Sequence, residues 1–404
     1  MKILVLSDLH AFTPNDAVGG RAPSILVNSK SGDRGVVNPI SLIPEVLRDE
    51  GLEVDWILCP GDIADRADPD AQEFAWRALT GLKQEVGARL LLATAGNHDL
   101  DSRLKHSQYD PKGALQALVP PFPGLDNETC DKYWSRNFHI HIENGIRLVN
   151  LNSAAFHGYS SEDEVKNPEF MHGRVSERTI SNIEEALRGE DCELNILFTH
   201  HHIYKDDRIY DEDYSEMKYG SRLVDRLTEL TLSSWLVIHG HQHYPEIRYG
   251  PGKAHLPVLF SSGSVSAVID APYSSEAPNQ FYHVTLFPDR DDTNNWTPCG
   301  VVRAWHWELR KHWQRTPRNF NIPYGYGFGC RTGALELAQR VKKTMEEQSQ
   351  PLLEGKDVFA HIPEMKFLLK EGFDEVIKHL AGLGVKYSQG EIPNESVFRL
   401  AQTP

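Results

Sequence analysis

Five apolar segments of the chain each run directly into a group of polar, chemically reactive residues. Their apolar character is continuous rather than alternating, which is typical of strands buried on both faces of an α/β sheet. The segments are residues 2–7, 54–60, 89–95, 195–199 and 233–239. Helical spacing is found between several of them, at residues 70–86, 176–188 and 217–231. The repeated order of strand, polar group and helix predicts an α/β fold.

The polar groups after the five strands consist mainly of Asp, His and Asn. They read DLH at 8–10, GD at 61–62, GNHD at 96–99, HHH at 200–202 and GHQH at 240–243. Each group alone has an ordinary structural explanation, since Gly-Asp is a common turn dipeptide and Asn tolerates left-handed backbone geometry. However, ligands bind at the carboxyl ends of the strands in such sheets. We therefore expect the five groups to converge in space.

Taken together and in this order, the five groups resemble the signature of the calcineurin-like metallophosphoesterase superfamily. The resemblance covers roughly residues 1–310 and includes every block of the signature. It implies a four-layer αββα sandwich. The GNHD ending, and Ala67 where protein phosphatases carry Gly, make the chain more similar to the cyclic-nucleotide and glycerophosphodiester phosphodiesterases of the superfamily.

The resemblance implies a site for two divalent metal ions. The implied ligands of one ion are Asp8, His10 and His243, those of the other are Asn97, His200 and His241, and the bridging ligand is Asp62. These nitrogen and oxygen ligands suit Mn, Fe or Zn, and no Cys is among them. Paired ions lower the pKa of a bound water, so that a metal-bridging hydroxide is the implied nucleophile.

Four further residues are candidates for catalysis and substrate binding. In the family, the residue in the place of His98 points at the leaving-group oxygen, where it can act as a general acid. A role in orienting the substrate without proton transfer is the alternative. Asp99 is expected to orient His98 through a ring N–H. His201 and His202 are candidate substrate-binding residues, with partly exposed loop imidazoles as the alternative.

The chain is expected to contain two domains. Further strand-like segments lie between residues 281 and 310, and helical patterns follow at 333–347, 364–371 and 373–382. We therefore predict a phosphoesterase domain over 1–315, and an aromatic and Gly-rich linker with a small helical C-terminal appendage over 316–404. Homo-oligomerisation through the C-terminal helices is a hypothesis. Residues 11–40 are rich in Gly, Pro, Ser and Asn and are expected to form a long loop.

The charge of the chain narrows the choice of substrates. The 404 residues contain 42 Lys and Arg against 57 Asp and Glu, so the formal net charge is −15. Such a balance argues against a general nucleic-acid coat or a protein that binds anionic membranes. Two divalent ions and two ligand carboxylates would still give a local charge of −2 + 4 = +2, or +1 with a bridging hydroxide. This favours a compact phosphate ester as the substrate.

The apolar stretches and the Cys residues of the sequence indicate where in the cell the protein is expected. No apolar stretch approaches the ~18 residues of a membrane span, and the N-terminal apolar run is shorter than that of a signal peptide. The five Cys residues form an odd set without a CxxC pair, which fits neither a disulfide framework nor a structural zinc site. We expect a soluble, cytoplasmic protein without a membrane partner.

The leading functional hypothesis is a dinuclear-metal-dependent phosphohydrolase, namely a phosphodiesterase that acts on a small phosphodiester or nucleotide. A DNA or RNA nuclease with the same site is the alternative, because residues 303–318 interleave basic and aromatic side chains that could stack on bases. We favour the other explanation of this strip, an outer strand with aromatic residues inward and basic residues outward. A catalytically inactive scaffold is a third hypothesis, and the presence of all seven implied ligands argues against it.

Overall fold

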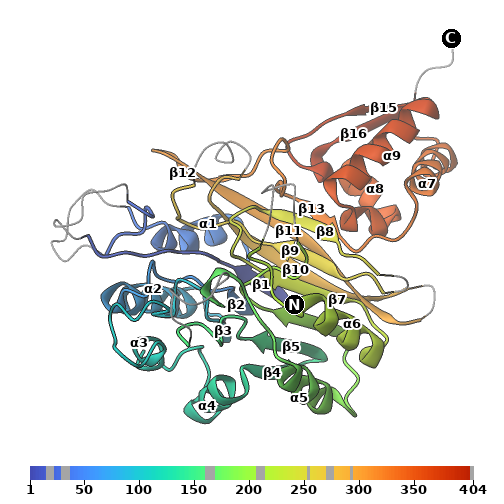
Figure 1. Ribbon diagram of the computed structural model, residues 1–404. Coiled ribbons are helices and arrows are strands. Elements are labelled where there is room, and N and C mark those ends of the chain that lie inside the picture. Colours follow the sequence, from blue (N-terminus) through green and yellow to red (C-terminus); the bar gives the residue numbers. More distant parts are fainter. Residues whose placement is uncertain are drawn as a thin grey trace.

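Figure 1 shows the computed structural model, in which two central sheets carry the helices on their outer faces. The structure describes residues 1–14, 22–28, 37–159, 169–205, 214–252, 255–269, 277–291 and 294–400. Of the long loop that we expect at 11–40, residues 15–21 and 29–36 lie outside the described residues.

The first sheet places the N-terminal strand in its middle. Its strands, in spatial order, are β12 (His312–Arg315), β11 (Trp296–Glu308), β10 (Gln280–Arg290), β1 (Lys2–Val5), β2 (Trp56–Cys59) and β3 (Leu90–Ala93), and β13 (Tyr326–Phe328) also pairs with β11. Strands β1, β2 and β3 are parallel. Strand β10 is antiparallel to β1. The carboxyl ends of the three parallel strands therefore lie along one edge of the sheet.

The second sheet also has parallel strands at its centre. Its order is β4 (Phe138–Glu143), β5 (Ile146–Leu151), β6 (Leu194–Phe198), β7 (Trp235–His239), β9 (Val258–Ser261) and β8 (Glu246–Tyr249). Strands β5, β6, β7 and β9 are parallel, and the two outer strands are antiparallel to their neighbours. The helices of this part of the chain are α1 (Ile43–Asp49), α2 (Pro69–Glu85), α3 (Gly113–Gln116), α4 (Asn127–Arg136), α5 (Glu177–Leu187) and α6 (Gly220–Thr231), with short 3-10 turns η1 (Ile40–Leu42) and η2 (Glu169–Met171).

Burial on both faces explains why polar and apolar residues do not alternate along the central strands. Along β1, Ile3 and Val5 pack against the second sheet, whereas Leu4 packs in the cluster beneath α1 and α2. Helices α5 and α6 cover the outer face of the second sheet, where Ile183 and Leu227 join its core. Successive strand residues point to opposite faces, so each strand must be apolar on both. The result is the predicted four-layer αββα sandwich.

The C-terminal part of the chain forms a smaller unit with its own apolar core (Figure 1, red). Its elements are α7 (Ala334–Glu347), β14 (Leu352–Glu354), α8 (Gly355–His361), η4 (Pro363–Phe367), α9 (Lys370–Gly382), β15 (Val385–Ser388), η5 (Pro393–Glu395) and β16 (Val397–Leu400). The helices predicted at 333–347 and 373–382 are present as α7 and α9, whereas the pattern at 364–371 corresponds to the 3-10 turn η4 and the first residues of α9. The structure adds a three-stranded sheet, in the order β14-β16-β15, that the sequence analysis did not predict.

This unit is attached to the first sheet on the side of β11 and β13. The N–H of Gly327 donates to the carbonyl of Leu368 at 3.0 Å, and the N–H of Cys330 donates to that of Phe367 at 2.9 Å. Because β13 belongs to the first sheet, the segment 316–329, which we expected to be a linker, is in part a strand of the phosphoesterase sheet. Within the described residues, no helix has both the length and the apolar composition needed to cross a membrane.

The basic and aromatic strip at 303–318 is part of the packed sheet. Trp305 and Trp313 are buried, and Phe281 stacks on Trp305 at a ring distance of 4.8 Å. Arg315 points outward and binds Glu50 through two hydrogen bonds of 2.7 and 2.8 Å. The favoured explanation, an outer strand with its aromatic residues inward, is therefore confirmed for these residues. The two buried indoles are not available to stack on nucleic-acid bases.

Candidate metal centre

The polar groups of the five strands meet where the carboxyl ends of the two sheets adjoin. Backbone hydrogen bonds fix the turns to one another. Asp8 N–H donates to the Gly61 carbonyl at 3.1 Å, and Gly240 N–H donates to the His200 carbonyl at 3.1 Å. A further hydrogen bond joins the ends of the two sheets. In it, the His241 N–H donates to the Asp8 carboxylate at 3.1 Å. The predicted convergence of the five groups is thus present in the structure.

The first set of ligands contains Asp8, His10 and His243, whose nitrogen and oxygen atoms face one another. His10 Nε2 lies 3.0 Å from His243 Nε2, and His243 Nε2 lies 3.3 Å from Asp8 Oδ1. Ser7 Oγ donates to the other oxygen of Asp8 at 2.5 Å, which orients this carboxylate. The three side chains form one of the groups with potential metal-binding geometry.

The second set contains Asn97, His200 and His241. The carbonyl oxygen of Asn97 lies 2.9 Å from His200 Nε2 and 3.0 Å from His241 Nδ1. The two ring nitrogens are 3.2 Å apart. Three atoms from three different strand ends therefore converge on one point.

Asp62 lies between the two sets. Its Oδ2 is 3.6 Å from His10 Nε2 of the first set and 3.3 Å from His200 Nε2 of the second. Its Oδ1 accepts a hydrogen bond of 2.8 Å from the backbone N–H of His98. The side chain is almost fully buried. Asp62 therefore faces a ring nitrogen of each set.

The donor atoms fit a pair of divalent ions. The Nδ1 proton of His200 is held by the Pro60 carbonyl at 2.6 Å, so the lone pair of a neutral ring lies on Nε2. That lone pair faces the Asn97 and Asp62 oxygens, which are acceptors as well. Acceptors that face one another in a buried place can be joined by a proton on the ring or, once that proton is lost, by a metal ion between them. Spacings near 3.0 Å are those of neighbouring ligands around an ion with bonds of about 2.0–2.2 Å.

The ionisation of the buried groups follows from their pairing. Burial raises the pKa of Asp62, but the adjacent His200 and His98 rings outweigh it and hold the pKa well below its usual range. Burial lowers the pKa of His200, and the Asp62 carboxylate outweighs it and raises the pKa to about 9. The pKa of Asp8 is likewise lowered, because His243 outweighs the effect of burial. The two carboxylates therefore remain ionised and available to a metal ion.

The backbone around the centre is strained in a way that places its ligands. Positive φ angles are found at Asp8 (52°), His10 (44°), Asp62 (52°), His241 (75°) and His243 (54°). This region is unfavourable for residues with a side chain, and such strain persists only where surrounding contacts impose it. Its concentration in five of the seven predicted ligands indicates that the fold has been shaped around this centre.

Asp65, rather than Asp99, contacts the imidazole of His98. The ring N–H at Nδ1 of His98 lies 2.9 Å from Asp65 Oδ1. Burial lowers the pKa of His98, but the carboxylates of Asp62 and Asp65 outweigh it and raise the pKa. A protonated ring is the form that a general acid requires. The expectation that Asp99 holds this ring is corrected accordingly.

Asp99 has a different place in the structure. Its carboxylate points back into the turns and accepts hydrogen bonds from the backbone N–H groups of Asp62 (2.7 Å), Gly96 (2.9 Å) and Ala64 (3.3 Å). Burial, reinforced by the nearby Asp62 charge, raises the pKa of Asp99 to about 7. Asp99 thus fixes the loops that carry the candidate ligands.

His201 and His202 lie behind the second ligand set. Both are buried, and the His201 ring bonds Ser153 Oγ at 2.8 Å. The His201 ring lies 4.5 Å from that of His241, and the His202 ring stacks on His241 at 5.7 Å. The structure therefore corrects the expectation of substrate contacts, because these rings pack against a candidate ligand instead of lining an open surface.

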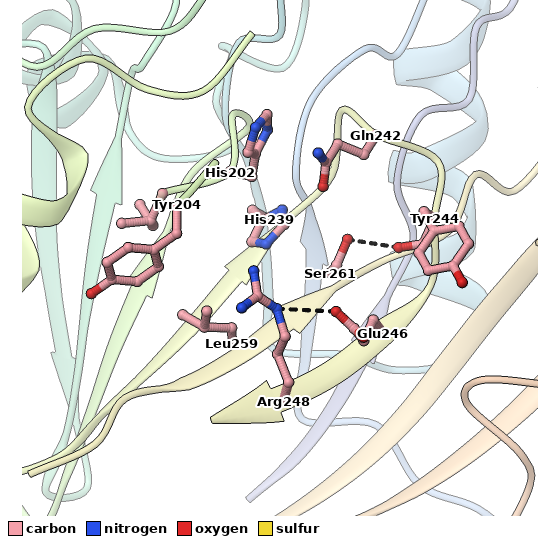
Figure 2. A pocket seen from close by; sticks show the side chains of 10 residues that line it. His202, Tyr204, His239, Gln242, Tyr244, Glu246, Arg248, Leu259 and Ser261 are labelled. Atoms are coloured by element: carbon pink, nitrogen blue, oxygen red, sulfur yellow. Dashed lines mark hydrogen bonds and ion pairs between the residues drawn. The ribbon is translucent and has the colours of Figure 1, made fainter. Parts of the chain in front are cut away.

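A small pocket has His202 as one of its lining residues (Figure 2). Its lining includes His202, His239 and the ion pair of Arg248 with Glu246 (3.0 Å). Its volume of about 10 Å³ is enough for about one water molecule. The pocket can hydrate these polar groups but cannot hold a substrate.

Comparison of the sequence with known protein families identifies the family of the chain. The profile of the calcineurin-like phosphoesterase family matches residues 1–245, which is more than half of the chain. The chain belongs to the calcineurin-like phosphoesterase family. The protein is therefore a phosphoesterase of a family that uses a dinuclear divalent metal centre, and its Asp and His clusters fit such a centre. Comparison with curated proteins gives no match.

The solved structures that match the chain include a purple acid phosphatase and a 5'-nucleotidase precursor. A purple acid phosphatase from yellow lupin (Lupinus luteus) seeds has 13% identity and a TM-score of 0.45, and the alignment covers 76% of this chain and 51% of that one. A 5'-nucleotidase precursor from Thermus thermophilus has 10% identity and a TM-score of 0.35, with 75% and 54% covered. The calcineurin-like phosphoesterase described here thus spans about half the length of each.

The glycines of the site leave no room for a side chain, which gives a direct test of its geometry. A Cβ at Gly96 would overlap with Asp62 Oδ1, whereas a Cβ at Gly81 in α2 meets no atom within 4 Å. We expect Gly96→Ala to displace Asp62 and to weaken Mn binding about 10- to 100-fold in a metal titration. Gly81→Ala should bind Mn as the wild type does. Equal affinities for all three proteins would contradict the placement of Asp62.

Proposed function

We propose that this calcineurin-like phosphoesterase is a phosphodiesterase that hydrolyses a small phosphodiester or nucleotide. The observation that carries the proposal is the shared position of the Asp62 carboxylate between two sets of ligands. The charge balance supports a diester. Two divalent ions held by the Asp8 and Asp62 carboxylates, together with one hydroxide, would have a local charge near +1, which would match a singly charged diester better than a dianionic monoester.

The residues of the chain have distinct parts in this reaction. Metal ions bound by the seven candidate ligands would supply an activated water and would neutralise the phosphoryl oxygens. His98 donates a proton to the leaving oxygen as the bond from phosphorus to that oxygen breaks, and water provides the oxygen of the new bond. Asp65 holds the His98 ring through Nδ1 at 2.9 Å, which leaves Nε2 to face the substrate. The proton lost by His98 is replaced from water.

The two other hypotheses have less support. The nuclease hypothesis relied on the strip at 303–318, whose Trp305 and Trp313 are buried in the sheet core. The scaffold hypothesis requires an incomplete site, but all seven candidate ligands meet at one edge of the fold.

A substrate panel in the presence of Mn tests the proposal. We expect kcat/KM for bis(4-nitrophenyl) phosphate to exceed that for 4-nitrophenyl phosphate by about tenfold or more, equivalent to roughly 1.4 kcal/mol of transition-state binding. Cyclic nucleotides and single- and double-stranded DNA complete the panel. Faster hydrolysis of the monoester would refute the diester assignment, and preferential cleavage of DNA with a steep salt dependence would favour a nuclease.

The proposed role of His98 as a general acid is tested by varying the leaving group of the substrate. His98→Ala should slow diesters of alkyl alcohols by about 10²–10⁴-fold, because an alkoxide must be protonated as it leaves. Nitrophenyl diesters need little protonation and should be slowed far less. Asp65→Asn should give the same pattern in a weaker form, while His361→Ala on the exposed face of α8 serves as a control. Equal losses on both kinds of ester would argue against a general acid.

A further inference from the structure

A cavity of about 240 Å³ lies directly beside the metal centre. Asn97 and His98, the loop that follows them and Phe170 are among its lining residues. One water molecule needs only about 10–15 Å³, so this cavity has room for a substantial part of a substrate. Because His98 lines it, the cavity lies on the side of the centre where the leaving group departs.

Three cations line this cavity, in a chain whose net charge is −15. They are Arg66 from the loop after β2, and Arg103 and Lys105 from the loop after β3. Among the lining residues that the structure describes, the one carboxylate is that of Asp101. A local excess of positive charge against the sign of the whole molecule concentrates anionic groups at this place.

Asp101 does not cancel this excess, because its carboxylate is turned into the loop. It is largely buried, and it accepts hydrogen bonds from the backbone N–H groups of Lys105 (2.7 Å), His106 (2.7 Å) and Ser107 (2.8 Å). These bonds fold the loop around a single side chain. The positions of Arg103 and Lys105 at the cavity are therefore built into the fold.

The cations are held at the cavity in different ways. The Arg103 guanidinium lies over the Phe170 ring at 5.0 Å, an attractive arrangement. Arg66 Nε lies 3.5 Å from Asp65 Oδ2, which connects it to the carboxylate that holds His98. The Lys105 ammonium makes no hydrogen bond or ion pair with any other residue that the structure describes. It is the cation with the most freedom to bind an external anion.

We propose that this cavity binds the leaving group of the substrate and selects a leaving group that carries its own negative charge. The substrate class is a phosphate ester whose departing alcohol bears a second anion, either a carboxylate or a phosphate. Arg103 and Lys105 bind this anion, and Arg66 adds to the field. The inference rests on the proposed function, because it takes His98 as the donor to the leaving oxygen. It goes further by assigning specificity to residues outside the metal centre.

Matched aryl diesters test the proposal. The probes are phenyl phosphodiesters whose leaving groups are phenol, 4-carboxyphenol and 4-phosphooxyphenol, with Mn in the buffer. The wild type should show a kcat/KM about tenfold or more higher for the two anionic leaving groups than for phenol, as expected from one charge-assisted hydrogen bond. In the triple variant Arg66→Gln/Arg103→Gln/Lys105→Gln, this preference should fall to about one. A larger response to one anion identifies the preferred group.

Two further variants exclude trivial explanations. Arg48→Gln/Arg77→Gln/Lys132→Gln removes three exposed cations from α1, α2 and α4 and changes the net charge by the same amount, so it should keep the full preference. Lys105→Gln alone removes an exposed side chain without a partner among the described residues, and it should reduce the preference without loss of folding. A preference near one in the wild type, or an unchanged preference in the triple variant, would overturn the proposal.

Binding of the leaving group alone separates this proposal from the proposed function. In a ligand-observed NMR titration, 4-hydroxybenzoate should bind the wild type about tenfold more tightly than the triple variant, and phenol should not distinguish the two proteins. If no diester is hydrolysed but this difference is found, the proposed function fails and the anion pocket stands. If diesters are hydrolysed and 4-hydroxybenzoate binds both proteins equally, the pocket assignment fails and the proposed function stands.

Discussion

The buried carboxylate of Asp62 is the constraint on which the rest of the site depends. A carboxylate that is almost fully removed from water must be compensated by positive charge, and here it faces ring nitrogens from both ligand sets. The surrounding structure serves this arrangement. Two sheets bring their strand ends together, five ligands adopt positive φ angles, and a glycine at position 96 leaves the space that the carboxylate occupies.

The candidate metal ligands and the residues that we propose to select the substrate lie on different parts of the fold. The five strands that precede the candidate metal ligands are buried on both faces, which holds their ends in place. The loops that follow β2 and β3 lie farther out and carry Asp65, Arg66, Arg103 and Lys105. Loops tolerate sequence change better than strands. The cations of the proposed leaving-group pocket can therefore vary in sequence without a change in the candidate metal ligands.

Much of the site could be predicted from the sequence because its ligands lie directly after strands. A strand fixes the direction of the chain, and the seven candidate ligands lie only two to five positions beyond their strands, which confines them to one edge of the sheet. Asp65 was missed because it lies six positions beyond β2, directly before a turn in which Arg66 and Ala67 both have a φ of 54°. Sequence spacing alone cannot decide which carboxylate such a turn brings to His98.

The same limit applies to the other differences. His201 and His202 adjoin a ligand in sequence, but packing against Ser153 and His241 places their rings behind the centre. Strands β14, β15 and β16 are three or four residues long, too short for an alternating pattern to be recognised. The cavity beside His98 joins loops that are distant in sequence, so only the folded chain reveals it.

The most direct test of the central claim is the metal content of the purified protein. After equilibration with excess Mn and removal of unbound ions, elemental analysis should find about two Mn per wild-type chain, and about one or fewer in Asp62→Asn, because the shared ligand has lost its charge. A wild type that binds one ion or none, or a variant that retains two ions with unchanged affinity, would contradict the account of Asp62 as the carboxylate that joins the two sets of ligands.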